Sequence, residues 1–315
     1  MSVRNLPLGL FGAVMGIVGL GLTARATATV LPGFLRAPAY FTELWVALGT
    51  LLFMVLIVAY SLKVVRYADA VKAEFWNPVT LGFCGALPVG MSLVAGGIAP
   101  YLPGTGQALW WASFVLLLAF QMFTLYRWLS GGIELAQLNA GWLIVMVGGI
   151  VLPGPAFTLG LAEAARFTFG VSATVAPILM ALLLYRAAFG PALPEPLRPS
   201  WFILLVPPSL IYANGLLLFP EAAFLENLFY FAVLLAVALV IYARGFLRWP
   251  FGPAWWAFTF PLDALAYAAV RFALTHDGGP WGWVAGIALG AAIAVVALVL
   301  LRTLARARYL FAKRL

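Results

Sequence analysis

Residues that carry redox and metal chemistry are scarce in this sequence. Its 315 residues include one cysteine and one histidine. A single cysteine excludes a disulfide within the chain, and a single histidine excludes haem ligation by two histidines. Zinc sites and iron–sulfur clusters normally draw on several His, Cys or acidic ligands. We therefore expect no metal ion and no cofactor.

Charge is scarce as well. Asp, Glu, Lys and Arg make up 9% of the chain, against about 25% in soluble domains, and 65% of the residues are apolar. A water-soluble globule needs more polar residues to cover its surface, so the composition predicts an integral membrane protein. The net charge of +8 is typical of the Lys and Arg excess in cytoplasmic loops. Nucleic acid is not an expected partner, because there is no basic domain and no alternation of basic and aromatic residues.

Ten apolar runs are long enough to cross a membrane, which takes about 20 residues. The first run follows a single basic residue, Arg4, and no small-residue cleavage site follows it, so we expect a retained spanning helix rather than a signal peptide. The helix-breaking cluster Pro153-Gly-Pro155 is predicted to separate the fifth run from the sixth. Residues 1–315 are thus expected to form one all-α transmembrane domain. The predicted spans are 7–27, 41–64, 78–97, 107–128, 139–153, 156–186, 199–218, 222–244, 253–274 and 281–304.

Basic residues gather on one side of this ten-span topology. That side holds both termini and the loops that follow even spans, and fourteen of the 18 Lys and Arg residues fall on it. Because Lys and Arg are enriched in cytoplasmic loops, both termini are predicted to be cytoplasmic, in a plasma membrane or bacterial inner membrane. The short basic tail 302–315 is expected to lie at the anionic leaflet surface. The fourteen residues are Arg4, Lys63, Arg66, Lys72, Arg127, Arg186, Arg198, Arg244, Arg248, Arg302, Arg306, Arg308, Lys313 and Arg314.

Prolines and glycines interrupt the odd spans more regularly than the even ones. The third, seventh and ninth spans each begin with a proline and carry another eight to ten residues later. A proline inside a helix removes a backbone hydrogen bond and kinks it, and the freed carbonyls are tolerated in a membrane where they line a cavity. The pattern favours five helical hairpins with the odd helices around a pore, although membrane helices also carry Pro and Gly for other reasons. The candidate pore-lining or kink residues are Gly12, Gly16, Pro88, Gly149, Pro207 and Pro261.

The odd spans contain few ionisable residues, chiefly Asp263 and Arg271 in the ninth span. A cation pathway usually shows rings of Asp or Glu, whereas an anion pathway can rely on helix dipoles, weak donors and a positive surrounding field. The pattern therefore favours anions. Asp263 lies about two turns from Arg271, too far for an intrahelical pair. Three roles stay open for Asp263: a structural partner, a proton-coupling site, or a site facing the pore mouth.

An aromatic residue, Phe260, directly precedes Pro261 midway along the ninth span. If this helix lines a pore, the ring projects into the lumen and blocks ions by its bulk and by dewetting. On helical periodicity alone, a packing role is the favoured interpretation.

The sequence resembles the tellurite-resistance/dicarboxylate transporter family, which includes bacterial TehA proteins and plant slow-type anion channels. The resemblance covers essentially the whole chain. Its most specific part is Trp255-Trp256-Ala-Phe-Thr-Phe260-Pro261 in the ninth span. Further matches are Leu10-Phe11-Gly12, the segment from Tyr67 to Pro78, and the prolines Pro88 and Pro207.

This resemblance implies a homotrimer of ten-helix protomers. Each protomer is expected to have quasi-fivefold symmetry and its own pore, lined by the five odd helices. A phenylalanine of the ninth helix occludes the pore, and Phe260 matches it by motif, so the resemblance favours a gate over a packing residue. The transported species are anions: chloride or nitrate in channels, dicarboxylates or sulfite in carriers.

Two functional hypotheses follow. The first is an anion channel or channel-like anion permease gated by Phe260, acting on small inorganic or organic anions in a lipid bilayer, with weak selection by size. The second is a proton-coupled carrier of C4-dicarboxylate, sulfite or tellurite-type oxyanions, with Asp263 as the proton site. An enzyme is not expected and no catalytic residue is assigned, because the sequence offers no credible nucleophile and base pair.

Overall fold

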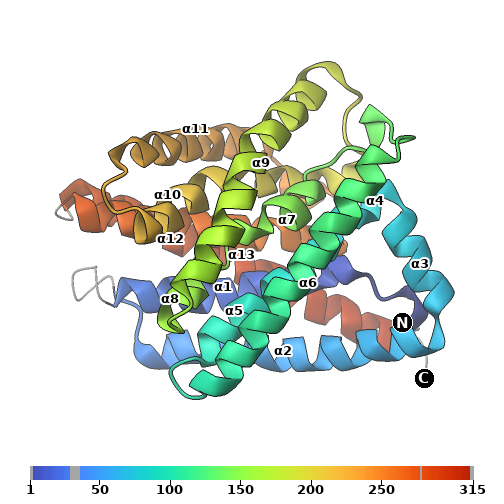
Figure 1. Cartoon of the computed structure of the whole chain (residues 1–315), viewed down its shortest axis with the longest axis horizontal. Helices are drawn as coiled ribbons and strands as arrows, with labels where there is room; N and C mark the ends of the chain where they lie inside the picture. Colours follow the sequence, from blue (N-terminus) through green and yellow to red (C-terminus); the bar gives the residue numbers. More distant parts are fainter. Residues whose placement is uncertain (1–2, 29–35, 277–278, 313–315) are drawn as a thin grey trace.

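The structure, a computed structural model, describes residues 3–28, 36–276 and 279–312. Within these residues the chain forms helices and connections, with no strand. Ten helical spans are long and apolar enough to cross a membrane, which confirms the predicted all-α membrane fold and its number of spans. The spans form a bundle, in which the start of the chain, the connecting helix α3 (Ala68–Trp76) and the end of the chain lie at the same end (Figure 1).

The even spans are built on continuous α-helices and form the outer part of the bundle. In the most apolar stretch of each even span, only 22% to 39% of the residues are buried. Large apolar side chains such as Leu51, Val115 and Ile287 remain exposed there, as expected for helices that face lipid. These helices are α2 (Ala39–Arg66), α6 (Pro103–Leu129), α9 (Ala162–Phe189), α11 (Glu226–Tyr242), which η8 (Ala223–Leu225) precedes, and α13 (Gly279–Ala312).

The odd spans lie inside, and each contains 3₁₀ as well as α-helical segments. Between 67% and 89% of the residues in their most apolar stretches are buried. The first span is η2 (Leu8–Phe11) and α1 (Gly12–Thr27), and the third is α4 (Pro78–Leu81), η4 (Gly82–Gly85) and α5 (Ala86–Ile98). The fifth is α7 (Gly141–Val147), η6 (Gly148–Ile150) and α8 (Pro153–Thr158). The seventh is η7 (Glu195–Leu205) and α10 (Val206–Leu218), and the ninth is η10 (Pro253–Phe258) and α12 (Thr259–Thr275).

Contacts between the spans follow a cyclic order. Each odd span packs against the even span that follows it, in the pairs α1 with α2, α5 with α6, α8 with α9, α10 with α11, and α12 with α13. The odd spans also touch one another around a closed ring. In that ring α1 contacts α5, α5 contacts α8, α8 contacts α10, α10 contacts α12, and α12 returns to α1.

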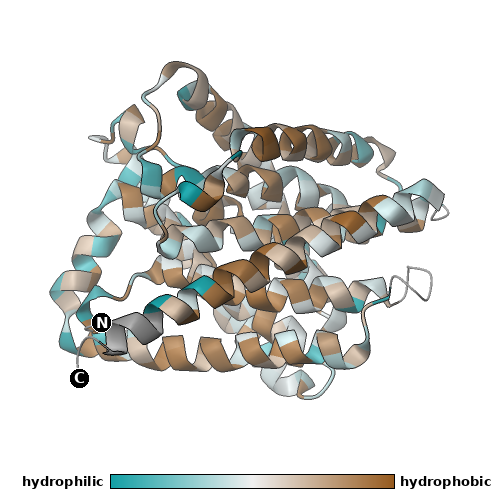
Figure 2. Cartoon of the chain, turned by 180° about the vertical axis from the view of Figure 1, so that it is seen from behind, coloured by the Kyte–Doolittle hydropathy of each residue, from teal (hydrophilic) through white to brown (hydrophobic). Residues whose placement is uncertain are grey.

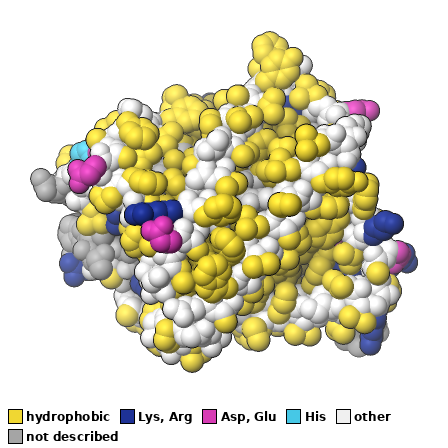
Figure 3. All heavy atoms as spheres, viewed as in Figure 1, with side chains coloured by type: hydrophobic (Ala, Val, Ile, Leu, Met, Phe, Trp, Pro, Cys, Tyr) yellow, Lys and Arg dark blue, Asp and Glu magenta, His cyan; other side chains and the backbone are white. Residues whose placement is uncertain are grey.

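Polarity follows this arrangement. Hydrophobic residues run along the long outer helices, and hydrophilic residues gather most densely at the end where the termini lie (Figure 2). In the space-filling view, apolar side chains cover the middle of the visible face, and Lys, Arg, Asp and Glu lie mostly toward its margins (Figure 3). An apolar belt between two polar ends fits a chain that crosses a bilayer.

One predicted boundary is wrong. The sequence placed the break between the fifth and sixth spans at Pro153-Gly-Pro155, but the fifth span continues to Thr158 and the sixth begins at Ala162. Pro153 is the first residue of α8, a position where the missing N–H costs no helical hydrogen bond. The chain turns instead at Gly160, whose φ of 73° lies in the left-handed region that glycine tolerates best.

Part of the predicted basic tail, residues 313–315, lies outside the described residues. The remaining short connecting elements are η1 (Val3–Asn5), η5 (Leu135–Gln137) and η9 (Phe246–Arg248).

Candidate pore and its constriction

The prolines of the odd spans lie where the α-helical part of each span begins. Pro88 is the third residue of α5, Pro207 the second of α10, and Pro261 the third of α12. In the first span the change from 3₁₀ to α-helix comes at Gly12. Proline in a first turn interrupts few backbone hydrogen bonds, so these residues mark a change of helix type rather than a bend in the middle of a regular helix.

All five odd spans contribute to a cavity that opens toward the end of the bundle where the termini lie; we call it the proximal cavity. Its volume is about 210 Å³. One lining residue from each span in turn is Gly12, Val89, Val147, Pro207 and Pro261. Most of the lining is apolar, and the one charged residue among the described lining residues is Glu74 of α3.

A second cavity of about 260 Å³, the distal cavity, lies further along the same five spans. Its lining is more polar than that of the proximal cavity. One lining residue from each span in turn is Thr23, Leu93, Thr158, Asn214 and Asp263. Arg25 of α1 lines it as well, and this side chain is 28% exposed.

Phe260 lies between the two cavities. Of the described residues, only Phe260 and Val151 line both cavities. Phe260 is 6% exposed. Gly19 of α1 lies against the ring: a Cβ added there would be 3.0 Å from Cδ2 of Phe260. Phe260 and Val151 thus form the wall that the two cavities share.

Three of the predicted pore or kink residues line neither cavity among the described residues. Gly16, Pro88 and Gly149 are absent from the described residues that line either cavity. A Cβ at Gly16 would overlap the side chain of Thr259, and a Cβ at Gly149 would overlap that of Ser172, so these glycines permit close approach between helices.

The backbone carbonyl of Pro88 accepts a hydrogen bond of 2.6 Å from Ser113 of α6, which ties the third span to its outer neighbour. Gly12, Pro207, Phe260 and Pro261 line the proximal cavity as described, and Asp263 lines the distal one.

Asp263 is buried in the wall of the distal cavity, with 1% of its surface exposed. Neither carboxyl oxygen has a hydrogen-bond partner among the described residues. The Thr23 hydroxyl donates to the main-chain carbonyl of Asp263, at 3.3 Å, rather than to its side chain. The Asn214 amide nitrogen donates to the carbonyl of Ile150 at 2.8 Å, and its Oδ1 has no partner.

Arg25, the other charged residue of the distal cavity, is paired. Its Nη2 lies 3.0 Å from both carboxylate oxygens of Glu43 and donates to the carbonyl of Gly97 at 3.2 Å. A hydrogen bond to the same carboxylate raises the pKa of the nearby Tyr101 phenol. Glu43 therefore neutralises the guanidinium.

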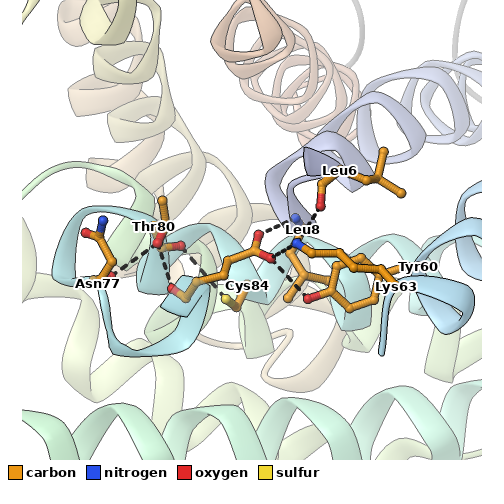
Figure 4. A network of polar contacts seen from close by, with 8 residues as sticks. Leu6, Leu8, Tyr60, Lys63, Asn77, Thr80 and Cys84 are labelled. Atoms are coloured by element: carbon orange, nitrogen blue, oxygen red, sulfur yellow. Dashed lines mark hydrogen bonds and ion pairs between the residues drawn. The ribbon is translucent and has the colours of Figure 1, made fainter. Parts of the chain in front are cut away.

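A polar network surrounds Glu74 at the proximal cavity (Figure 4). Its carboxylate accepts hydrogen bonds from the backbone N–H of Leu8 at 2.6 Å, the Tyr60 hydroxyl at 3.1 Å and Lys63 Nζ at 2.7 Å. Lys63 also donates to the carbonyl of Leu6, and the Thr80 hydroxyl donates to the carbonyl of Glu74. These bonds join the first, second and third spans around a neutralised ion pair.

Comparison with known proteins identifies the family. Residues 5–304 match the SLAC1 family model, described as a voltage-dependent anion channel. The chain belongs to the SLAC1 family. This confirms the resemblance found from the motif around Phe260.

Among the SLAC1-family relatives is the S-type anion channel SLAH3 of Arabidopsis thaliana, 25% identical over 273 residues, which are 85% of this chain and 43% of the relative. The guard cell S-type anion channel SLAC1 of the same plant is 26% identical over 289 residues, 87% of this chain and 51% of the relative. The uncharacterized transporter MJ0762 of Methanocaldococcus jannaschii is 25% identical over 301 residues, 87% of this chain and 85% of the relative. The chain thus spans about half the length of these plant relatives.

In this SLAC1-family chain the sequence led to no prediction for Glu74, and Lys63 was counted only among the basic residues of the predicted cytoplasmic side. The two are eleven residues apart, and their contact depends on the turn between α2 and α3. The sole signal in the sequence is an acidic residue near the start of an odd span, on a side of the topology rich in basic residues.

Proposed function

We propose that this SLAC1-family chain is an anion channel or channel-like anion permease of a plasma or bacterial inner membrane, closed at Phe260. One observation carries the proposal: the Phe260 ring lines both cavities of a path enclosed by all five odd spans. A hydrophobic constriction stops ions by its bulk and by expelling water. The ring of contacts among the odd spans favours the quasi-fivefold pore that the resemblance implies.

In the described part of the chain, the wall of the proximal cavity offers no net negative charge that would attract cations. The proximal cavity has a mostly apolar wall, and Lys63 neutralises its single described acid, Glu74. A wall without fixed charge favours large, weakly hydrated anions, because they lose less hydration energy on entry. We therefore expect weak selection by size, with nitrate passing more readily than chloride.

The test is anion flux into proteoliposomes. Phe260→Ala should raise chloride and nitrate flux well above that of the wild type, since it removes the ring that separates the cavities. Phe258→Leu is the matched control. The ring centroids of Phe258 and Phe202 lie 4.7 Å apart, and Phe258 is not among the described residues that line either cavity. Unchanged flux in a Phe260→Ala protein that melts like the wild type would show that Phe260 is not the gate.

A second candidate is a proton-coupled carrier of C4-dicarboxylate, sulfite or tellurite-type oxyanions, with Asp263 as its proton site. The unpartnered carboxyl of Asp263 in the distal cavity supports it. Wild-type flux of these anions should then follow an imposed pH gradient, and Asp263→Asn should abolish that dependence. Wild-type flux that is the same with and without the pH gradient would count against a proton-coupled carrier.

The orientation and assembly of the chain are part of the proposal. The gathering of hydrophilic residues at the end that holds the termini supports cytoplasmic termini and a cytoplasmic proximal cavity. Fluorescent-protein fusions to each terminus test this, because they should fluoresce only in the cytoplasm. The family resemblance supports a homotrimer, which native mass spectrometry of the detergent-purified protein tests directly.

A further inference from the structure

Three charged side chains are among the described residues lining the path, and they differ in how they are neutralised. Glu74 forms an ion pair with Lys63, with 2.7 Å between Oε2 and Nζ, and Arg25 forms one with Glu43, with 3.0 Å between Nη2 and Oε1. Neither carboxyl oxygen of Asp263 has a partner in the part of the chain that the structure describes. The uncompensated charge is therefore an acid, in a path that we propose to carry anions.

Asp263 also lies close to the proposed gate. A Cβ built on Gly19 would be 3.1 Å from Oδ2 of Asp263 and 3.0 Å from Cδ2 of Phe260, so both side chains contact the same glycine. Both line the distal cavity. An anion that reaches the distal face of the ring thus comes close to the carboxyl group.

No neighbouring charged group compensates Asp263. On its own helix, α12, the ionisable groups toward the distal end are Tyr267, which lines the cavity, and Arg271, which does not. From the helices packed against α12, α1 brings Arg25, already bound to Glu43, α10 brings Tyr212, and α11 brings Glu226. Glu226 lies 3.8 Å from His276. Among the described residues, α13, η7 and η10 bring no charged side chain to the distal cavity. None of these groups bonds to the carboxyl.

We propose that Asp263 is the proton-binding site of the distal cavity, and that an anion reaches Phe260 from this side only while Asp263 holds a proton. This inference rests on the proposed function. In the binding step the carboxylate takes one proton from solution in the cavity and becomes a carboxylic acid, and no other bond forms or breaks. The partly exposed Arg25 in the same wall indicates that solution reaches the cavity.

Electrostatics sets the size of the effect. For an anion about 6 Å from an ionised carboxylate, at an effective dielectric constant of about 20, repulsion lowers occupancy about a hundredfold. Water in the cavity weakens this repulsion, so we expect a change in flux of at least about tenfold. The protonated acid has no net charge, and its hydroxyl can donate a hydrogen bond to the passing anion.

The experiment uses the Phe260→Ala protein, in which the path is open, with the same pH on both sides of the vesicle membrane. Chloride flux should rise at least about tenfold as the pH falls from about 8 to about 5. With Asp263→Asn added, flux should be high at both pH values. The matched control adds Glu163→Gln, which removes an acid that is 86% exposed and paired with Arg166; this variant should keep the pH dependence.

Several outcomes would overturn the inference. Equal flux at both pH values in Phe260→Ala would refute it and leave the proposed function intact. A pH dependence that persists with Asp263→Asn would assign the effect to another group. Flux that follows replacement of sodium by potassium, and not pH, would identify a metal-cation site instead.

A second measurement does not depend on flux. Infrared difference spectra of the wild-type protein between about pH 8 and pH 5 should contain a carboxylic-acid C=O band that Asp263→Asn removes. If Phe260→Ala conducts at neither pH, the proposed function fails, and this band then decides separately whether Asp263 binds a proton. Its absence would refute the proton site.

Discussion

Breaking the buried Lys63–Glu74 pair should destabilise the protein much more than removing the pair altogether. Lys63 Nζ lies 2.7 Å from Glu74 Oε2, and the two side chains are 4% and 9% exposed. At that separation and an effective dielectric constant of about 20, the attraction is about 6 kcal/mol. Withdrawing each ion from water costs several kcal/mol, so the net value of the pair is small. A single substitution removes the attraction but leaves one buried charge.

Three variants make the prediction quantitative. Lys63→Met should lower the free energy of unfolding by about 3–5 kcal/mol, toward the lower end because Leu8 and Tyr60 still donate to Glu74. Glu74→Gln should cost a similar amount, because the neutral amide no longer compensates the charge of buried Lys63, which keeps the carbonyl of Leu6 and the face of the Tyr60 ring as uncharged partners. The double variant should cost less than about 2 kcal/mol, far below the sum of the single changes.

The assay is unfolding of the purified protein in detergent at neutral pH, followed by tryptophan fluorescence. The matched control is the pair Arg4–Asp69, which has the same N–O distance of 2.7 Å but side chains 56% and 65% exposed. Asp69→Asn should cost less than about 1 kcal/mol. The prediction would be refuted if the double variant lost as much unfolding free energy as the two single variants together. It would also be refuted if Asp69→Asn lost as much as either single variant, since burial would then not explain the difference.

Two further predictions concern glycines. Gly85→Ala should lower the free energy of unfolding by about 1–3 kcal/mol or more, because the new Cβ would lie 2.5 Å from Cα of Val145. Gly104→Ala is the control and should leave stability unchanged or slightly higher, because a Cβ there would have no described atom within 4 Å. Equal melting temperatures for the two variants would contradict this prediction. In the Phe260→Ala background, Gly19→Leu should lower chloride flux, because Cβ of residue 19 points toward the space that the ring vacated. Flux equal to that of Phe260→Ala alone would place this space outside the conduction path.

The sequence predicted the number of spans correctly because each span is a long apolar run that ends at charged or turn-forming residues. It also anticipated which spans are buried, because Pro88, Pro207 and Pro261 each lie eight to ten residues into an odd span and broken helices need protein around them. The signal is not exclusive, since the sixth, outer span has Pro177 inside its helix. The predicted boundary between the fifth and sixth spans at Pro153 was wrong, because a proline does not show by itself whether a span ends there or continues. A proline that ends one helical segment and a proline that begins the next have the same local sequence signal.

Side-chain partners were harder to predict. Gly16 and Gly149 stood out as possible lining residues, yet what each glycine faces, Thr259 or Ser172, depends on how separate helices pack. Glu74 was missed because its partners come from the first, second and third spans. Asp263 was noticed because an acid inside a membrane span is rare, but its isolation becomes visible only once every neighbouring helix is in place.

The shared wall of the two cavities has a consequence for blockers of the path. In the proposed pore, a small molecule in the proximal cavity and another in the distal cavity would enter from opposite ends of the bundle, and both would touch the Phe260 ring. Each would restrict the ring positions open to the other, so the two would compete without sharing a binding site. Blockers added from the two sides are therefore expected to be antagonistic rather than independent, and resistance to both can arise through one substitution.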